Sequence, residues 1–362
     1  MQDHETLFDR VRGSLLGGAI GDALGWPIEF ESLNRIRERH GDAGVTGFLR
    51  APDATHPQQI TDDTQMTLFT AEGLLRCPPG ADPNPVLRRA YLRWLATQNQ
   101  EKPDPEPDGW LAGLPFLYAV RAPGNACMSG LRRQSEGYLP PLEFGDPGPV
   151  NPKSKGCGTV MRSAPFGLAA FGPDRAFYTA MRAAQLSHGH PTAYLAAGAF
   201  ATIIDAVLTG TELPIAVRDT INRLSVMPSS AETVAALSTA LAIAHLGPAT
   251  PERLELVGAG WVAEECLAIA VYSALHTYRT GDVRAGLLLS VNHSGDADST
   301  GAVAGNLIGA MYGLSTLPIE WVSVIEGRDE LLRVADDLVL NFFYQDRAAL
   351  ADRYPLDSEL PH

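Results

Sequence analysis

Apolar residues recur along most of this chain at the three- and four-residue spacing of a helix, and alternating apolar and polar runs are scarce. The segment from Trp261 to Leu275 is rich in alanine and apolar on most faces, which predicts a central buried helix. The pattern therefore predicts an all-α fold. Helices are expected at residues 6–25, 62–76, 84–98, 176–187, 191–209, 213–224, 230–245, 260–280, 282–291, 298–315 and 329–343.

Glycines recur at every fourth position in two of these segments. They stand at positions 13, 17, 21 and 25 in the first and at 301, 305, 309 and 313 in the second. Residues four apart share one face of a helix, and each glycine costs roughly 1 kcal/mol of helix propensity relative to alanine. Close packing against another helix backbone would offset that cost. Such packing would also bring the acidic residues that flank the two segments together.

Two clusters of carboxylates and hydroxyls each precede a predicted helix, Thr61-Asp62-Asp63-Thr64 and the run from His293 to Gly301. Either cluster alone is explained by helix capping and by acidic residues that meet the helix dipole. Asp296 and Asp298 lie two residues apart, however, and Ser299 adds a hydroxyl. Both clusters together predict one divalent-metal site, whose oxygen ligands favour Mg²⁺, Mn²⁺ or Ca²⁺. Because the clusters lie far apart in sequence, we expect residues 1–362 to form a single domain.

Glu29 follows the first glycine-rich helix, which Pro27 is expected to end. This places Glu29 on a loop that is free to close over a site, although an ordinary surface glutamate fits the same pattern. Asp22 lies among the glycines, where a buried carboxylate needs a partner.

A glycine-rich turn, Gly156 to Arg162, follows Lys153, Ser154 and Lys155 and leads into an apolar segment. Its backbone N–H groups could bind phosphate, although a plain loop has the same composition. Ser187-His188-Gly189-His190-Pro191 carries two histidines, for which neutral polar contacts are favoured over metal binding.

Composition limits the partners and the compartment. The formal net charge is −14, so a broad electrostatic surface for nucleic acid or anionic membrane is not expected, although a local basic pocket for phosphates is compatible with it. The four cysteines are far apart and show no CxxC pair, which fits a reducing compartment. No signal peptide is evident at the N-terminus, and the apolar stretch from Leu15 to Ile28 is too short to span a membrane. We expect a cytoplasmic protein with no membrane partner.

The order of these segments resembles the ADP-ribosylglycohydrolase family, which includes the dinitrogen-reductase-activating glycohydrolases. The resemblance spans roughly residues 12–315, and the ordered set of motifs is more specific than any one of them. The matching segments are residues 17–25, Thr61 to Met66, Gly158 to Arg162, Ser187 to Pro191 and Gly295 to Gly301.

The resemblance implies a single compact orthogonal helical bundle with two Mg²⁺ or Mn²⁺ ions. By motif position the metal ligands would be Thr61, Asp62, Asp63, Asp296, Asp298 and Ser299. The residues bound to ADP-ribose would be Ser154, Gly156, Gly158 and Met161 along the diphosphate and His188 beside it. The catalytic carboxylates would be Asp62, Asp63, Asp298 and the mobile-loop Glu29. Two positions depart from the common pattern: Cys157 stands where Asn is frequent, and Ser299 where Thr is frequent.

The implied activity is hydrolysis at the anomeric carbon of ADP-ribose through an oxocarbenium-like state. Asp63 is the first candidate for the base that activates water, with Glu29 as second carboxylate or gate. ADP-ribosyl-arginine on protein is the favoured substrate, and serine-linked, O-acetyl and nucleobase-linked ADP-ribose, including that on nucleic acid, stay open. The loops at 99–110 and 134–155 would decide among them. A monomer is expected.

Three other functions share part of this pattern. A diphosphate enzyme of the terpene-synthase kind would need a DDxxD motif, which fails because position 66 is Met. A nucleotide pyrophosphatase could use the same ligands and would release AMP. A non-catalytic ADP-ribose-binding protein would be expected to lose metal ligands, whereas this chain keeps the set.

Overall fold

The computed structural model describes residues 4–50 and 56–357. Within these ranges it contains sixteen α-helices, short 3₁₀ turns and two isolated β-bridges, and no β-strands. The all-α prediction is confirmed. The helices are α1 (His4–Gly25), α2 (Leu33–His40), α3 (Asp62–Leu75), α4 (Pro83–Thr97), α5 (Asn125–Glu136), α6 (Ala164–Leu168), α7 (Pro173–Ala184), α8 (Pro191–Leu208), α9 (Leu213–Ser225), α10 (Ala231–Ala244), α11 (Pro251–Leu254), α12 (Ala263–Thr280), α13 (Val283–Val291), α14 (Ala297–Tyr312), α15 (Ile319–Val322) and α16 (Arg328–Phe342). Short 3₁₀ turns include η1 (Trp26–Ile28) and η4 (Cys157–Thr159).

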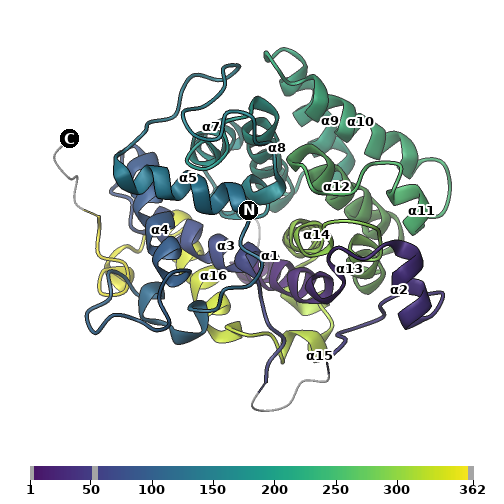
Figure 1. Cartoon of the computed structure of the whole chain (residues 1–362), viewed down its shortest axis with the longest axis horizontal. Coiled ribbons are helices and arrows are strands. Elements are labelled where there is room, and N and C mark those ends of the chain that lie inside the picture. The colour runs from purple at the N-terminus through teal and green to yellow at the C-terminus, as the bar shows by residue number, and fades with distance from the viewer. Residues whose placement is uncertain (1–3, 51–55, 358–362) are drawn as a thin grey trace.

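The two glycine-rich helices, α1 and α14, pack against each other in antiparallel directions near the middle of the molecule (Figure 1). A Cβ atom placed on Gly21 would overlap the carbonyl of Gly301, and one placed on Gly305 would overlap the carbonyl of Gly17. Only glycine therefore allows this approach of the two backbones. The structure confirms that these glycines pack closely against another helix backbone, which is the contact expected to offset their low helix propensity.

Polar contacts fix the register of this helix pair. Ser14 donates to the carbonyl of Asn306 at 2.9 Å, and the Asn306 amide donates to the carbonyl of Ser14 at 2.8 Å. The register sets the C-terminal end of α1 beside the N-terminal end of α14. The loop that follows α1 therefore lies next to the second acidic cluster.

The predicted end of the last glycine-rich helix at residue 315 was wrong. α14 ends at Tyr312, and Gly313 adopts a left-handed φ of 86°, which ends a helix at little cost for glycine. The predicted start of the buried alanine-rich helix was also early. α12 begins at Ala263, so Trp261 lies before the helix and is 39% exposed.

α8 and α12 are both largely buried and pack against each other. Within the described residues α8 is the one helix long and apolar enough to cross a membrane, but 94% of it is buried against the rest of the protein. Burial of this kind is expected for a core helix.

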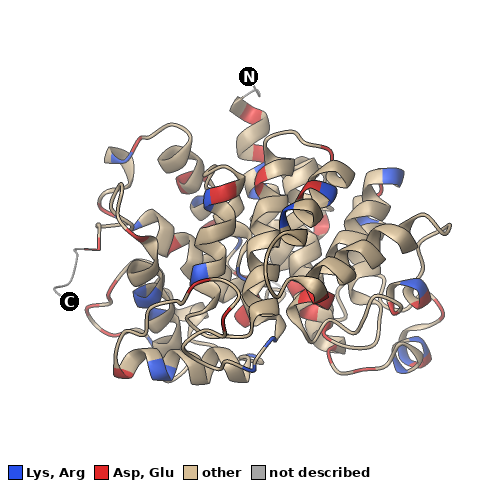
Figure 2. Ribbon diagram, turned by 90° about the horizontal axis from the view of Figure 1, so that it is seen from above, with Lys and Arg blue, Asp and Glu red and all other residues tan. Residues whose placement is uncertain are grey.

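Five short helices were not predicted: α2, α5, α6, α11 and α15. The loop expected at 134–155 starts inside α5, whereas residues 99–110 form turns and bends as predicted. In the view of Figure 2, Lys and Arg are scattered over the helices and loops and alternate with Asp and Glu.

Candidate active site

Both acidic clusters lie at the N-terminal ends of helices, and both do contain capping residues. Thr61 caps α3 by accepting from the N–H of Asp63 at 3.3 Å, and Asp296 caps α14 by accepting from the N–H of Ser299 at 3.3 Å. Capping explains these two side chains but leaves Asp62, Asp63 and Asp298 without such a role.

Asp22 connects α1 to the start of α3. Its carboxylate accepts from the backbone N–H of Thr61 at 2.9 Å and from the hydroxyl of Thr64 at 2.5 Å. Burial raises the pKa of Asp22 to about 6, although these hydrogen bonds favour the charged form. The partner expected for this buried carboxylate is thus the backbone that carries the first acidic cluster.

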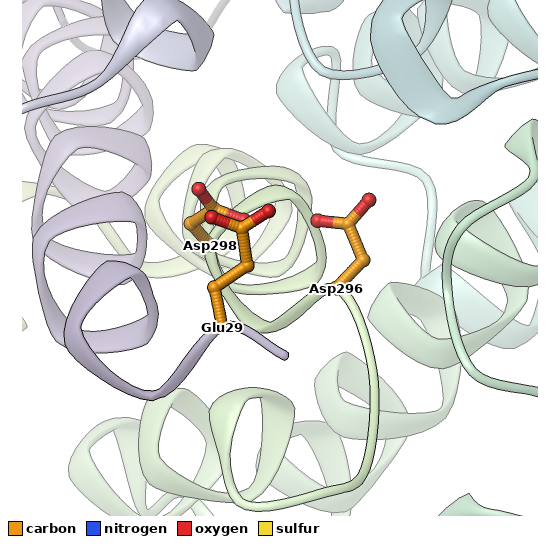
Figure 3. Close-up of side chains that lie close together, drawn as sticks. All are labelled: Glu29, Asp296 and Asp298. Carbon is orange, nitrogen blue, oxygen red and sulfur yellow. The ribbon is translucent and has the colours of Figure 1, made fainter. Parts of the chain in front are cut away.

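The carboxylates of Glu29, Asp296 and Asp298 offer oxygen atoms that lie within 4.8 Å of one another (Figure 3). Glu29 lies directly after η1, as the stop at Pro27 predicted, and Asp296 and Asp298 lie at the start of α14. The sequence placed Glu29 on a covering loop, and the structure brings it into the carboxylate cluster itself.

Burial and mutual repulsion act on the whole cluster. Burial raises the pKa of Glu29 to about 7, and the charge of Asp296 adds to this shift. Burial likewise raises the pKa of Asp62, Asp63 and Asp298 well above their ordinary value, with the neighbouring carboxylates as a further cause. Carboxylates packed together in this way need protons or cations to neutralise them.

The residues fit a divalent cation. Oδ1 of Asp63 is buried and accepts no hydrogen bond, although a buried polar atom without a partner is costly. Asp62 accepts from the N–H of Gly124 at 3.2 Å, and the other oxygen of Asp63 lies 3.3 Å from the Thr61 hydroxyl. Thr61 itself lies behind the carboxylates and is fully buried.

These carboxylates form one wall of a cavity of about 590 Å³. Five residues predicted to bind substrate lie on its walls: Ser154, Gly156, Gly158, Met161 and His188. The predicted ligands Asp62, Asp63, Asp296, Asp298 and Ser299 also line it, together with Glu29. The sequence did not point to Phe30, residues 122–127 and Trp261, which complete the lining together with Cys157 of the glycine-rich turn.

The glycine-rich turn is positioned by contacts with its neighbours. Cys157 donates from its backbone N–H to the carbonyl of Trp261 at 3.2 Å, and its thiol donates to Asp296 at 2.7 Å. A Cβ on Gly158 would lie 2.7 Å from the Cys127 sulfur, so glycine is required there. The turn therefore joins the acidic wall to the opposite wall of the cavity.

The described cavity lining contains no Lys or Arg, so the local basic pocket considered for phosphates is absent from it. Lys155 instead forms ion pairs with Glu232 at 2.9 Å and Glu264 at 2.5 Å. A bound diphosphate would have to rely on backbone N–H groups and neutral donors here.

The protonation of His188, a neutral donor of the cavity, is controlled by a chain of buried polar groups. Arg162 donates to the Ser187 hydroxyl at 2.6 Å, and this hydroxyl lies 2.9 Å from Nδ1 of His188. Since Arg162 can only donate, the Ser187 hydroxyl donates either to Nδ1 of His188 at 2.9 Å or to the carbonyl of Ala184 at 3.4 Å. The shorter contact favours Nδ1, which leaves the proton of His188 on Nε2. Burial, followed by the charge of Arg162, lowers the pKa of His188 to about 3. His188 is therefore neutral and presents an N–H beside the glycine-rich turn.

His190 does not share this role. Its Nδ1 accepts from the backbone N–H of Thr192 at 3.2 Å and so caps α8. The preference for polar contacts over a metal-binding pair agrees with these positions.

Comparison with known proteins decides the family. A model of the ADP-ribosylglycohydrolase family matches residues 3–348. The chain belongs to the ADP-ribosylglycohydrolase family. This confirms the resemblance seen in the sequence.

Known relatives are similar to this glycohydrolase over most of their length. The ADP-ribosyl-[dinitrogen reductase] glycohydrolase of Rhodospirillum rubrum is 26% identical, covering 90% of this chain and 93% of that protein. The ADP-ribosylarginine hydrolase Tri1 of Pseudomonas putida is 25% identical, covering 92% and 79% respectively. A solved "ADP-ribosylglycohydrolase-related protein complex" matches with a TM-score of 0.64 and 26% identity, covering 92% of this chain and 98% of that one. Family and relatives indicate a glycohydrolase that acts on ADP-ribosylated substrates.

Proposed function

We propose that this glycohydrolase is a metal-dependent enzyme that cleaves the N-glycosidic bond of ADP-ribosyl-arginine in proteins and releases intact ADP-ribose. The observation that carries the proposal is the meeting of five carboxylates with a glycine-rich turn in one cavity. The relative named ADP-ribosylarginine hydrolase supports the arginine linkage, and the relative named for dinitrogen reductase supports a protein substrate.

Two divalent cations, Mg²⁺ or Mn²⁺, are the proposed cofactors. Asp62, Asp63, Asp296, Asp298 and Ser299 would hold them, with Thr61 behind Asp63 and with Glu29 as a further carboxylate that the structure adds to the predicted set. When bound, such cations supply Lewis acidity and orient oxygen groups of a substrate. The unpaired oxygen of Asp63 and the repulsion among these carboxylates are what favour cation binding at this wall.

The other wall would hold the ADP-ribose. The turn from Gly156 to Met161 would lie along the diphosphate, with Ser154 beside it, and neutral His188 would donate from Nε2 to a phosphate oxygen. Because no cationic side chain lines the described cavity, the substrate would be fixed by directed donors rather than by bulk positive charge.

The same placement would hold the anomeric carbon beside the carboxylate wall. Asp63 is the proposed base that removes a proton from the attacking water, and Glu29 is the second carboxylate, which contacts the ribose or closes the site. Asp62 and Asp298 complete the wall from the starts of α3 and α14.

The test is incubation of an ADP-ribosyl-arginine peptide with the protein, with and without Mg²⁺ or Mn²⁺, followed by mass spectrometry. Cation-dependent release of intact ADP-ribose is expected, and it should disappear in an Asp62→Ala, Asp63→Ala double variant. Undiminished activity in that variant would contradict the proposed roles.

Other products would indicate a different function. Release of AMP would indicate a pyrophosphatase. Binding of ADP-ribose without release would direct the search to serine, acetyl and nucleobase linkages, or to a non-catalytic binding protein if these also stay intact.

A further inference from the structure

Two aromatic side chains stand at the cavity next to the carboxylate wall. The rings of Phe30 and Trp261 stack with centroids 5.0 Å apart and planes inclined by 24°. Both residues line the cavity, and Phe30 is 72% exposed while Trp261 is 39% exposed. A large apolar ring exposed to this extent beside a polar site gains from covering by a ligand.

The backbone holds these rings in place. Phe30 directly follows Glu29, and its N–H donates to the carbonyl of Gly295 at 3.4 Å. It also adopts a left-handed φ of 69°, a conformation that is unfavourable for a residue with a bulky side chain. Trp261 is fixed through its carbonyl, which accepts from the N–H of Cys157. The ring pair is thus tied to the segments that carry Glu29 and the second acidic cluster.

The charge around the rings selects among ligands. The described lining of the cavity contains five carboxylates and no Lys or Arg. Two divalent cations carry four positive charges, one fewer than the five negative charges of these carboxylates when all are ionised. A cationic group beside the rings would therefore meet a favourable field.

We propose that Phe30 and Trp261 form an acceptor subsite that stacks the planar, cationic guanidinium of the arginine to which ADP-ribose is attached. The subsite rests on the proposed function and deepens it by naming the residues that recognise the leaving group. Guanidinium stacks on aromatic faces and is weakly hydrated, so it suits a half-exposed ring pair. The hydroxymethyl group of serine has neither the plane nor the charge that this pair would recognise.

The test compares a substrate that contains arginine with a ligand that lacks it. In a Phe30→Leu, Trp261→Leu double variant, KM for an ADP-ribosyl-arginine peptide should rise about tenfold, the loss of one cation–π contact of moderate strength. Kd for ADP-ribose, measured by calorimetry, should stay within about twofold because ADP-ribose carries no guanidinium. Trp261→Phe should retain most of the arginine affinity.

Tyr278→Leu is the matched control, because Tyr278 lies on the distal part of α12 with a similar exposure of 37%. This variant should change neither constant. Equal weakening of both ligands by the double variant would show that the rings hold the ADP-ribose itself and would overturn the subsite. An unchanged KM, or a selective loss of nucleobase-linked substrate, would overturn it as well.

Failure of the proposed function would be seen separately. If the wild-type protein cleaves no arginine-linked substrate with any cation, the subsite is tested by binding measurements alone. The subsite is then supported only if the ADP-ribosyl-arginine peptide binds more tightly than ADP-ribose and the double variant removes that difference in affinity.

Discussion

Replacing Gly305 with alanine should separate the two central helices and reduce activity along with stability. Gly305 lies in the middle of α14, and it faces Gly17 of α1. A Cβ atom at position 305 would lie 1.9 Å from the carbonyl oxygen of Gly17 and 2.9 Å from the amide nitrogen of Gly18. These obstacles are backbone atoms, so no side-chain rotation can relieve the overlap.

The size of the effect follows from two opposing terms. A comfortable contact between heavy atoms is about 3.5 Å, so the helices must move apart locally by more than about 1 Å. Overpacking of a core costs about 1–3 kcal/mol, and rigid obstacles place this case at the upper end. Alanine returns about 1 kcal/mol of helix propensity. The expected net loss of unfolding free energy is about 2 kcal/mol, the difference of these two terms.

Activity should fall further than stability alone predicts. α1 leads to Glu29 and α14 begins beside Asp296, so separation of the helices widens the carboxylate cluster. Urea unfolding followed by circular dichroism and kcat/KM for ADP-ribose release should be measured on the same preparation. Gly47→Ala is the control, since its Cβ would meet only Trp321 at 3.7 Å. An unfolding midpoint and kcat/KM equal to those of the wild type would refute close backbone packing as the basis of the site.

Three further predictions address the charges and donors of the site. Burial raises the pKa of Asp22 to about 6 and that of Glu29 to about 7, so the folded state holds protons that the unfolded chain has released. The cation-free protein should therefore lose stability as pH rises from about 4, where such groups titrate when unfolded, to about 7. Mn²⁺ should raise the thermal midpoint more at pH 8 than at pH 5, and an equal rise would contradict this reasoning. Ser187→Ala removes the group that sets the tautomer of His188. Kd for ADP-ribose, measured by calorimetry, should therefore rise by about three- to tenfold, the value of one hydrogen bond. An unchanged Kd would contradict this role of Ser187. Gly158→Ala should weaken ADP-ribose binding more than Ser187→Ala does, because its Cβ would lie 3.1 Å from the His188 ring and 2.7 Å from the Cys127 sulfur; binding as tight as in the wild type would show that the turn tolerates a side chain.

Local patterns were enough to predict eleven of the sixteen described helices and the pairing of the two glycine-rich segments. Glycines four residues apart have a direct physical meaning, since they permit backbone approach on one face. The end of α14 was missed because Gly313 continues the same spacing although its backbone leaves the helix. Spacing alone cannot distinguish a packing glycine from a terminating one.

The cavity was only partly predictable, because half of its lining carries no chemical signature. Trp261 was predicted to lie in a buried helix and Phe30 carried no prediction, whereas in the structure both rings are exposed and stack on each other. Gly258 and Gly260, which adopt positive φ just before Trp261, were the available sign that the helix starts later. Lys155, which precedes the glycine-rich turn, does not line the cavity, and Glu232 and Glu264, distant in sequence, pair with it instead.

The proposed function depends on the binding of divalent cations by the carboxylate wall. The most direct measurement is calorimetric titration of Mn²⁺ into the wild-type protein and into an Asp63→Asn, Asp298→Asn double variant. Two Mn²⁺ ions per chain are expected for the wild type, with binding lost or at least tenfold weaker in the variant. Equal binding by both proteins, or no binding by the wild type at millimolar Mn²⁺, would contradict the account.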